Sequence, residues 1–245
     1  MGRAHEVRAA SMAATAARKS KVYSKFGKEI FMAAKAGGTD PNGNLTLRAW
    51  IDKAKAAQVP GDVIKRNIEK AKGGGGADYE NIRYEGFGPG NSMIIVECMT
   101  DNVNRTFGEV RACFTRTGGK IGVSGSVAHQ FSYVSLVIVE GRTEDGVLEA
   151  MLNGDVDVQE VEANDDGTVS VTGNSADLEK IKAAIAAADP AAKILDDRVS
   201  YLPATYVKLE ADDLRKFRNF LAATDELDDI EEVFSNVDMP EAEED

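Results

Sequence analysis

Apolar side chains recur with a helical period over the first part of the chain. Val22, Phe26, Ile30 and Ala33 follow one another at steps of three or four, so they share one face of a predicted helix, which ends at an AGG stretch. Two more helices follow, and their inward positions are Leu47, Trp50, Ile51 and Ala54 in the first and Ile64, Ile68 and Ala71 in the second. The glycine-rich stretch 72–78 then predicts a helix stop and a flexible linker.

The pattern changes after this linker to strand-like positions. Two such stretches, IRYEGF and SMIIVECM, are separated by GPGN, which is typical of a hairpin turn. A helix is predicted over 102–117, with Asp101 as its N-cap. Its inward side is predicted to consist of Val103, Phe107, Val110 and Phe114.

The next part has the order strand, helix, strand, strand, helix, strand. The strands are predicted at 134–140, 155–162, 168–173 and 192–202, and the helices at 143–153 and 175–188. This βαββαβ order is that of a ferredoxin-like domain, which is complete by itself. It therefore divides a second α/β domain, which we expect to finish with strand 205–210, a helix around Phe217 and strand 229–235.

These elements predict an α+β protein, in which an N-terminal three-helix domain precedes two α/β domains, one of them ferredoxin-like and inserted in the other. The expected bounds are 1–76 for the helical domain, 79–132 and 204–237 for the discontinuous α/β domain, 133–203 for the inserted domain and 238–245 for a disordered acidic tail. The apolar run 136–139 is far shorter than the about 20 residues that a membrane-spanning helix needs. We therefore expect no membrane segment and a cytoplasmic protein.

Charge is distributed unevenly between the helical domain and the rest. The whole chain has a formal net charge of −12. Residues 1–76 hold 15 Lys and Arg against 6 Asp and Glu, a net of +9, whereas residues 77–245 hold 14 against 35, a net of −21. Such asymmetry is typical of a protein with one end that meets a nucleic acid.

The basic helical domain is accordingly the predicted nucleic-acid-binding site. Lys21, Lys25, Lys28 and Lys35 lie mostly off the apolar stripe of the first helix, so an outward basic surface is expected. Lysine and arginine displace the counterions of a phosphate backbone, and a helical face can follow that backbone. The predicted contact residues are Arg3, Arg8, Arg18, Lys19, Lys21, Lys25, Lys28, Lys35, Lys65, Arg66, Lys70 and Lys72. The acidic α/β domains are expected to face protein partners.

Metal and nucleophile chemistry find little support in the sequence. Cys98 and Cys113 are the two cysteines, and they are interpreted as free thiols in a reducing compartment. With His5 and His129 they make no spacing that resembles a zinc site. No metal, no cofactor and no catalytic residue is predicted.

One polar cluster supports an alternative function. Asp101, Asn104 and Arg105 lie at a predicted strand-to-helix junction and could line a cleft between the two α/β domains of a ligand sensor or an enzyme. Helix capping combined with ordinary surface polarity explains the same residues, and this second interpretation is the favoured one.

Several motifs resemble one known family. The stretches KSKVYSKFGKEIFMAAKAGG, RAWIDKAKAAQVPGDVIKRNIEKAKG, YEGFGPGNSMIIVECMTDNVNRT and GGKIGVSGSVAHQF together are similar to the YebC/PmpR family, over nearly the entire chain and most weakly in its acidic last third. The first residues, GRAHEVR, depart from the commonest opening of that family, which reads like AGHSKW.

The resemblance implies three domains, one helical and two α/β. It implies a cytoplasmic transcriptional regulator that binds DNA, as bacterial members are described. It also keeps open a second function, because mitochondrial relatives are translational activators and some bacterial relatives are linked to ribosomes, so RNA or the ribosome is the alternative partner. No enzymatic activity and no catalytic residue come with the resemblance.

Overall fold

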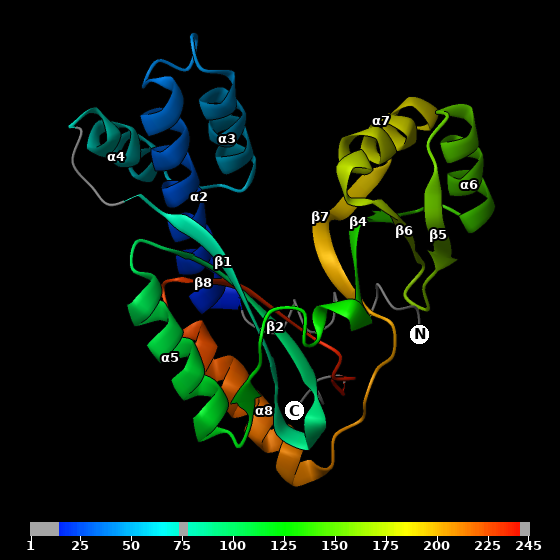
Figure 1. Ribbon diagram of the computed structural model, residues 1–245. Helices are drawn as coiled ribbons and strands as arrows, with labels where there is room; N and C mark the ends of the chain where they lie inside the picture. Colours follow the sequence, from blue (N-terminus) through cyan, green and yellow to red (C-terminus); the bar gives the residue numbers. More distant parts are fainter. Residues whose placement is uncertain (1–14, 74–77, 241–245) are drawn as a thin grey trace. The chain divides into compact units, whose positions relative to one another are not determined.

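The structure is a computed structural model that describes residues 15–73 and 78–240, with side chains from residue 21 onward. Its described residues form helices and two four-stranded sheets, so the chain has an α+β fold (Figure 1). The chain divides into two compact units. One contains residues 15–127 and Leu209–Val233, and the other contains Ala128–Lys208 and the segment that begins at Phe234.

Three helices open the first unit. They are α2 (Thr15–Gly37), α3 (Leu45–Ala56) and α4 (Gly61–Lys72). Their shared core contains Ile30, Leu47, Ile51 and Ile64, as the apolar spacing predicts. Asn44 fixes the turn between α2 and α3, because its Oδ1 accepts a hydrogen bond from the amide of Leu47 at 3.0 Å, in the manner of an N-cap.

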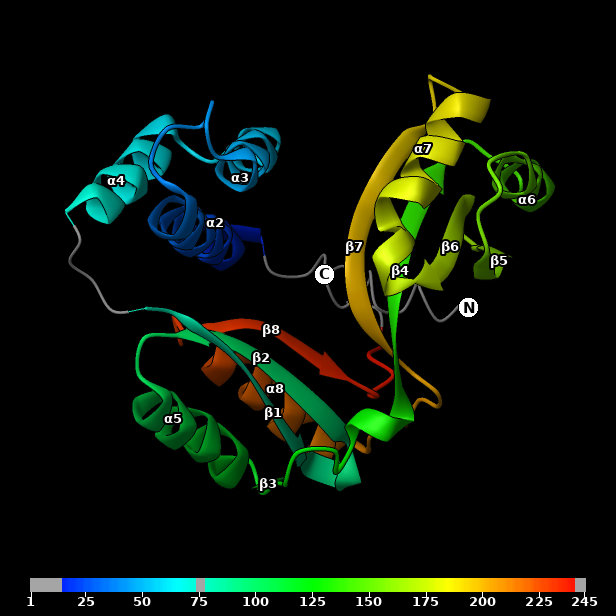
Figure 2. The same cartoon turned by 45° about the horizontal axis from the view of Figure 1, so that its top comes forward.

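The first sheet belongs to the same unit, except for its last two residues, Phe234 and Ser235, which fall in the second unit. Its strands are β1 (Glu80–Phe87), β2 (Met93–Thr100), β3 (Lys120–Ile121) and β8 (Ile230–Ser235), in the order β3-β1-β2-β8. β1 and β2 pair antiparallel through the short 3₁₀ turn η1 (Pro89–Asn91), where Gly90 has φ +62°. The helices α5 (Val103–Arg116) and α8 (Ala211–Asp225) cover one face of this sheet (Figure 2).

The second unit has the predicted ferredoxin-like order. Its strands are β4 (Phe131–Glu140), β5 (Val158–Ala163), β6 (Thr168–Asn174) and β7 (Lys193–Pro203), preceded by η2 (Ala128–Gln130). Its helices are α6 (Glu144–Asn153) and α7 (Leu178–Ala188), with η3 (Ser175–Asp177) before α7. The sheet order is β5-β6-β4-β7 and the pairs are antiparallel. Val137, Val139 and Val171 pack against Met151 and Ile181 from the helices.

Strand 205–210 is one prediction that the structure contradicts. The segment pairs at a single position, the bridge between Val207 and Val237. Leu209 turns away to pack near Gly90, since a Cβ placed on that glycine would lie 2.6 Å from Cδ2 of Leu209. Glu210, the last residue of the predicted strand, occupies the N-cap position of α8. The alternation of polar and apolar residues over 205–210 therefore belongs to an extended connection into a helix and not to a strand.

Two predictions about α5 are also wrong. The N-cap is Asn102, whose side chain accepts a hydrogen bond from the amide of Arg105 at 3.1 Å, because the carboxylate of Asp101 is engaged by the guanidinium of Arg105. Val103 and Phe107 do not face the core and are 39% and 40% exposed. The other two inward positions, Val110 and Phe114, are fully buried.

The bounds of the three domains given in the sequence analysis stay a prediction.

Candidate nucleic-acid interface

Lys28 is a correction to the predicted basic surface. Its ammonium donates hydrogen bonds to the carbonyls of Met99 at 3.0 Å and Asp228 at 2.7 Å, and to Oε1 of Glu231 at 2.9 Å. The residue is 8% exposed. All three ammonium hydrogens have acceptors inside the protein, so Lys28 has no donor left for a phosphate.

Lys21 lies two helical turns before Lys28 and therefore on the same side of α2. Its ammonium donates to the carbonyl of Thr224 at 2.8 Å and lies 3.4 Å from Oδ1 of Asp225. This side of α2 is thus a second packing surface, which meets the end of α8 and the residues around β8. The apolar stripe on the other side of α2 packs against α3 and α4.

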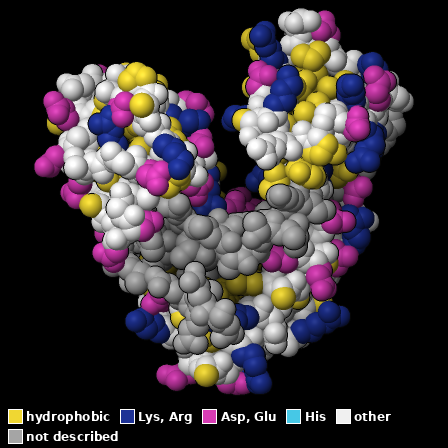
Figure 3. Space-filling view, turned by 180° about the vertical axis from the view of Figure 1, so that it is seen from behind, with side chains coloured by type: hydrophobic (Ala, Val, Ile, Leu, Met, Phe, Trp, Pro, Cys, Tyr) yellow, Lys and Arg dark blue, Asp and Glu magenta, His cyan; other side chains and the backbone are white. Residues whose placement is uncertain are grey.

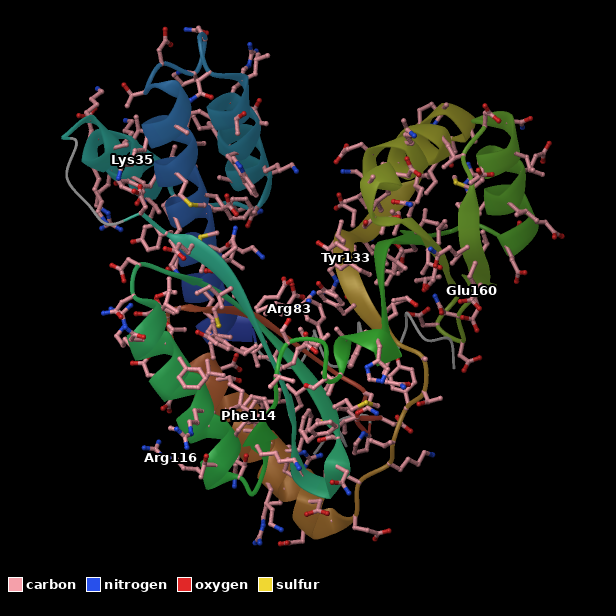
Figure 4. The ribbon with its side chains drawn as sticks, in the orientation of Figure 1. Lys35, Arg83, Phe114, Arg116, Tyr133 and Glu160 are labelled. Carbon is pink, nitrogen blue, oxygen red and sulfur yellow. The ribbon has the colours of Figure 1, made fainter. Side chains whose placement is uncertain are left out.

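Lys25 and Lys35 are also placed near acidic residues. Lys25 is half-buried. Burial raises the pKa values of Glu29 and Glu97, and the nearby Lys25 ammonium opposes this shift without reversing it. Lys35 is exposed, donates to Oδ1 of Asp78 at 2.6 Å, and is labelled in Figure 4. An ion pair this exposed stabilises the fold by at most about 1 kcal/mol, so Lys35 can exchange Asp78 for another anion.

The outer side of α4 carries the cations that are most available. Lys65 and Arg66 are exposed and make no ion pair within residues 21–73 and 78–240. Lys72 pairs at 2.6 Å with Glu69, and both side chains are largely exposed. Lys70 is exposed and lies 5.1 Å from the ring centre of Phe31, a cation–π contact.

Helix α3 adds three exposed cations that sequence reasoning did not select. They are Arg48, Lys53 and Lys55. Lys53 lies 5.4 Å from the ring centre of Trp50, and Lys55 lies 3.8 Å from Oδ1 of Asp52. The signal was present in the sequence, because all three fall outside the apolar positions of α3. Figure 3 shows one face of the molecule, where Lys and Arg side chains are interspersed with Asp, Glu and hydrophobic ones.

Four predicted contact residues cannot be placed as side chains. Arg3 and Arg8 lie outside the described residues. Arg18 and Lys19 belong to α2, but their side chains are outside the described part of the chain. The candidate contact residues with described side chains are therefore Lys35 near the end of α2, Arg48, Lys53 and Lys55 on α3, and Lys65, Arg66, Lys70 and Lys72 on α4. We call this set of exposed cations the α3–α4 basic surface.

The alternative polar cluster forms a structural network. The Arg105 guanidinium donates to Asp101 Oδ1 at 2.9 Å and to Asp229 Oδ2 at 2.6 Å. The hydroxyls of Thr100 and Thr106 also lie within hydrogen-bond distance of Asp229 Oδ2, at 2.9 and 2.8 Å. Burial acts to raise the pKa of Asp229, but these hydrogen bonds outweigh it and the pKa is lowered.

This network joins the junction of β2 and α5 to the loop before β8. Asn104, the third member of the predicted cleft, is exposed. The ligand-sensor or enzyme alternative at these residues stays a prediction.

The ferredoxin-like unit has a recess of about 270 Å³ on its sheet. Its lining consists of Ser132, Val134, Gln159, Glu160, Thr172 and Leu202. Glu160, labelled in Figure 4, is the ionisable member of this lining. A recess with a carboxylate and no cation does not suit a phosphate.

Other chemistry finds no site among the residues that the structure describes. Within them, no group of three or more His, Cys, Asp or Glu side chains could hold a metal ion. Cys98 and Cys113 are buried free thiols, and burial raises the pKa of Cys98 to about 12. Such thiols are poor nucleophiles, because the reactive form is the thiolate. Among the described helices, none combines the length and the apolar composition that a membrane-spanning helix requires.

Comparison with known proteins agrees with this architecture. The chain is 49% identical over 241 residues to a probable transcriptional regulatory protein of Marinobacter nauticus, covering 98% of this chain and 100% of the relative. It is 47% identical over 239 residues to a protein of the same description from Alcanivorax borkumensis, covering 98% and 100%. The crystal structure of a conserved hypothetical protein from Aquifex aeolicus is similar, with a TM-score of 0.74, 30% identity, and coverage of 94% and 95%.

Family models match both parts of the chain. The N-terminal domain of TACO1/YebC proteins matches residues 3–74, and the second and third domains match residues 79–237. The resemblance seen in the sequence motifs is thereby confirmed, and the chain belongs to the TACO1/YebC family.

Proposed function

We propose that this protein is a DNA-binding transcriptional regulator that contacts the phosphate backbone through the α3–α4 basic surface. The observation that carries the proposal is the position of Lys65 and Arg66 on α4, exposed and without an ion pair among the described residues. The relatives from Marinobacter nauticus and Alcanivorax borkumensis are described as probable transcriptional regulatory proteins, which supports a regulatory role.

The physical basis is electrostatic. Each cation that neutralises a phosphate releases condensed counterions, which favours binding and makes the affinity depend on salt. The remainder of the chain, residues 77–245, has a net charge of −21 and repels the same polymer. The molecule is therefore expected to meet DNA with its helical segment and to act without catalysis, in the cytoplasm.

A salt titration tests the proposal. Binding of the full chain to a labelled DNA duplex is measured by fluorescence anisotropy at several salt concentrations, for the wild type and for Lys65→Glu/Arg66→Glu/Lys72→Glu. The variant should bind more weakly, and its plot of log affinity against log salt should be flatter by about 3, from roughly 0.9 for each lost phosphate contact.

A matched control keeps the total charge change and moves its location. Lys180→Glu/Lys193→Glu/Lys208→Glu reverses three exposed lysines of the other unit. The slope of this control should stay close to that of the wild type. Equal slopes for both triple variants would reject a localised contact surface, and an unchanged slope in the α4 variant would reject its use of these cations.

The same cations suit RNA, so the ribosome is the alternative partner. Sedimentation of a cell lysate through a sucrose gradient separates the two. Migration of the wild type with ribosomal particles, lost in the α4 variant, would replace transcriptional regulation with a ribosome-associated function. Absence from these fractions, together with duplex binding, supports the proposal.

A further inference from the structure

Helix α5 exposes a phenylalanine ring beside a tyrosine. Phe107 is 40% exposed, and its ring centre lies 5.8 Å from that of Tyr84 on β1, with the two rings tilted by 46°. The Tyr84 hydroxyl lies 3.5 Å from the carbonyl of Val103, itself 39% exposed. Tyr84 itself is half-buried. Aromatic side chains of this size usually stabilise a core or an interface, so the exposed Phe107 ring against it marks a candidate contact surface.

The ring stands in a row of exposed residues. Asn104, Phe107, Arg111 and Thr115 follow at steps of three and four along α5 and therefore share one face. We call this row, together with Tyr84, the α5 stripe. Next to it, Gly108 leaves open space, because a Cβ placed there would meet no atom within 4 Å. The surface next to Phe107 is therefore not covered by a side chain at position 108.

The charge of the stripe differs from that of its surroundings. Helix α5 has three arginines and one glutamate, within a region of net charge −21. Arg105 is held by Asp101 and Asp229, but Arg111 is exposed and makes no ion pair with any residue whose side chain is described. A free cation next to an exposed ring fits a ligand that is both planar and anionic.

We propose that the α5 stripe is a second nucleic-acid site, which binds unpaired nucleotides. A base stacks on Phe107 and Tyr84, Arg111 contacts the adjoining phosphate, and the Asn104 amide faces the edge of the base. Bases inside a duplex are already stacked on each other, so the stripe selects single-stranded RNA or DNA. This site rests on the proposed function only in that its ligand is a nucleic acid, since it uses other residues and another contact.

The test replaces the ring while keeping an apolar side chain. Fluorescence anisotropy compares Phe107→Leu with the wild type on labelled oligo-U, oligo-dT and a DNA duplex, each about 12 nucleotides long, within the usual footprint of such sites. Phe107→Leu should bind both single strands about 5- to 100-fold more weakly, as expected for one lost stacked base, and should bind the duplex as the wild type does. Higher affinity for oligo-U identifies the ligand as RNA, and higher affinity for oligo-dT identifies it as DNA.

Two further variants show whether stacking is the cause. Phe107→Trp should restore binding, and its added fluorescence should be quenched by the oligonucleotides. Arg111→Gln should weaken single-strand binding, whereas Arg116→Gln, on the opposite side of the same helix, should not. Figure 4 shows Arg116 pointing away from α5 near the end of that helix.

Three results would overturn the proposal. The first is an unchanged single-strand affinity in Phe107→Leu, and the second is an equal loss of affinity for the duplex. The third is self-association of the wild type in sedimentation that Phe107→Leu abolishes, because a second copy of the chain would then occupy the stripe. A failure of the proposed DNA contact by the α3–α4 basic surface gives a different result. In that case Lys65→Glu/Arg66→Glu/Lys72→Glu has the same salt dependence of duplex binding as the wild type, while Phe107→Leu still binds single strands more weakly.

Discussion

The Lys28 ammonium lies 2.9 Å from Oε1 of Glu231, and each of these two side chains is 9% exposed. The pair joins α2 to β8 across 203 positions of sequence. Because the same ammonium also donates to the carbonyls of Met99 and Asp228, it links α2 to two neighbouring strands of the first sheet. The three-helix segment and this sheet, up to Val233 of β8, accordingly fall in one compact unit.

Removal of the Lys28 charge should be strongly destabilising. Lys28→Met leaves the Glu231 carboxylate buried without its partner, and breaking a buried pair in this way costs about 3–5 kcal/mol. Urea unfolding measures the loss in the free energy of unfolding. Lys65→Met, at an exposed position, is the matched control and should change stability by no more than about 0.5 kcal/mol. A Lys28→Met variant as stable as this control would contradict the structural role of the pair.

The Asn44 side chain should be needed for both its oxygen and its nitrogen. Its Oδ1 caps α3, and its Nδ2 donates to the carbonyls of Ala33 and Gly38, each at 2.8 Å. Asn44→Ala should lower the free energy of unfolding by about 2 kcal/mol, the upper range for an N-cap, because buried acceptors also lose their donor.

Asn44→Asp separates the two contributions, since it keeps the cap acceptor and loses the amide donor. We expect it to be at least as destabilising as Asn44→Ala in urea unfolding at neutral pH, because a buried carboxylate oxygen would then face the carbonyl oxygens of Ala33 and Gly38. A variant as stable as the wild type would mean that only the cap contributes. Asn42→Asp, an exposed replacement of the same kind in the same loop, controls for the added charge.

Local sequence patterns were sufficient for most of the fold. The βαββαβ order follows from period and turn residues alone, and the second unit has that order with α6 and α7 against Val137 and Val171. The sequence predicts a strand over 205–210, where apolar and polar residues alternate, but in the structure only Val207 pairs, with Val237. Pairing partners are non-local, so alternation alone does not supply them.

The candidate site was predictable only where a helix packs on one side. Lys65 and Arg66 lie opposite the single apolar stripe of α4 and are exposed as expected. Helix α2 has two packing surfaces, and the second is made by polar contacts of Lys21 and Lys28 with carbonyls and carboxylates more than 70 positions away. A lysine off the apolar stripe looks the same in sequence whether it meets water or a distant glutamate.

Glu97 should make the protein less stable as pH rises. Burial raises the pKa of Glu97, and the nearby Glu232 carboxylate raises it further, while Lys25 and Arg83 act against both. A carboxyl with a raised folded-state pKa binds its proton more tightly than in the unfolded chain, so its contribution is lost as pH rises through that pKa. Glu97→Gln should therefore gain stability relative to the wild type from acidic to neutral pH, measured by urea unfolding at each pH. A difference that stays constant with pH would contradict this ionisation effect.

Asp229 should have the opposite pH dependence. Although burial opposes ionisation, the hydrogen bonds from Arg105, Thr106 and Thr100 keep its pKa lowered. The unfolded state then binds more protons than the folded state in the acidic range, so this stabilisation is complete above the ordinary Asp pKa and is lost as pH falls through the lowered one.

Asp229→Asn should cost about 1–3 kcal/mol at neutral pH, from weakened hydrogen bonds to a charged acceptor. The deficit should shrink as the solution is acidified, because the wild-type carboxylate is then protonated too. Asp165→Asn, at an exposed position, should show no such convergence, and a deficit of Asp229→Asn that persists at the lowest pH would assign the effect to packing instead of charge.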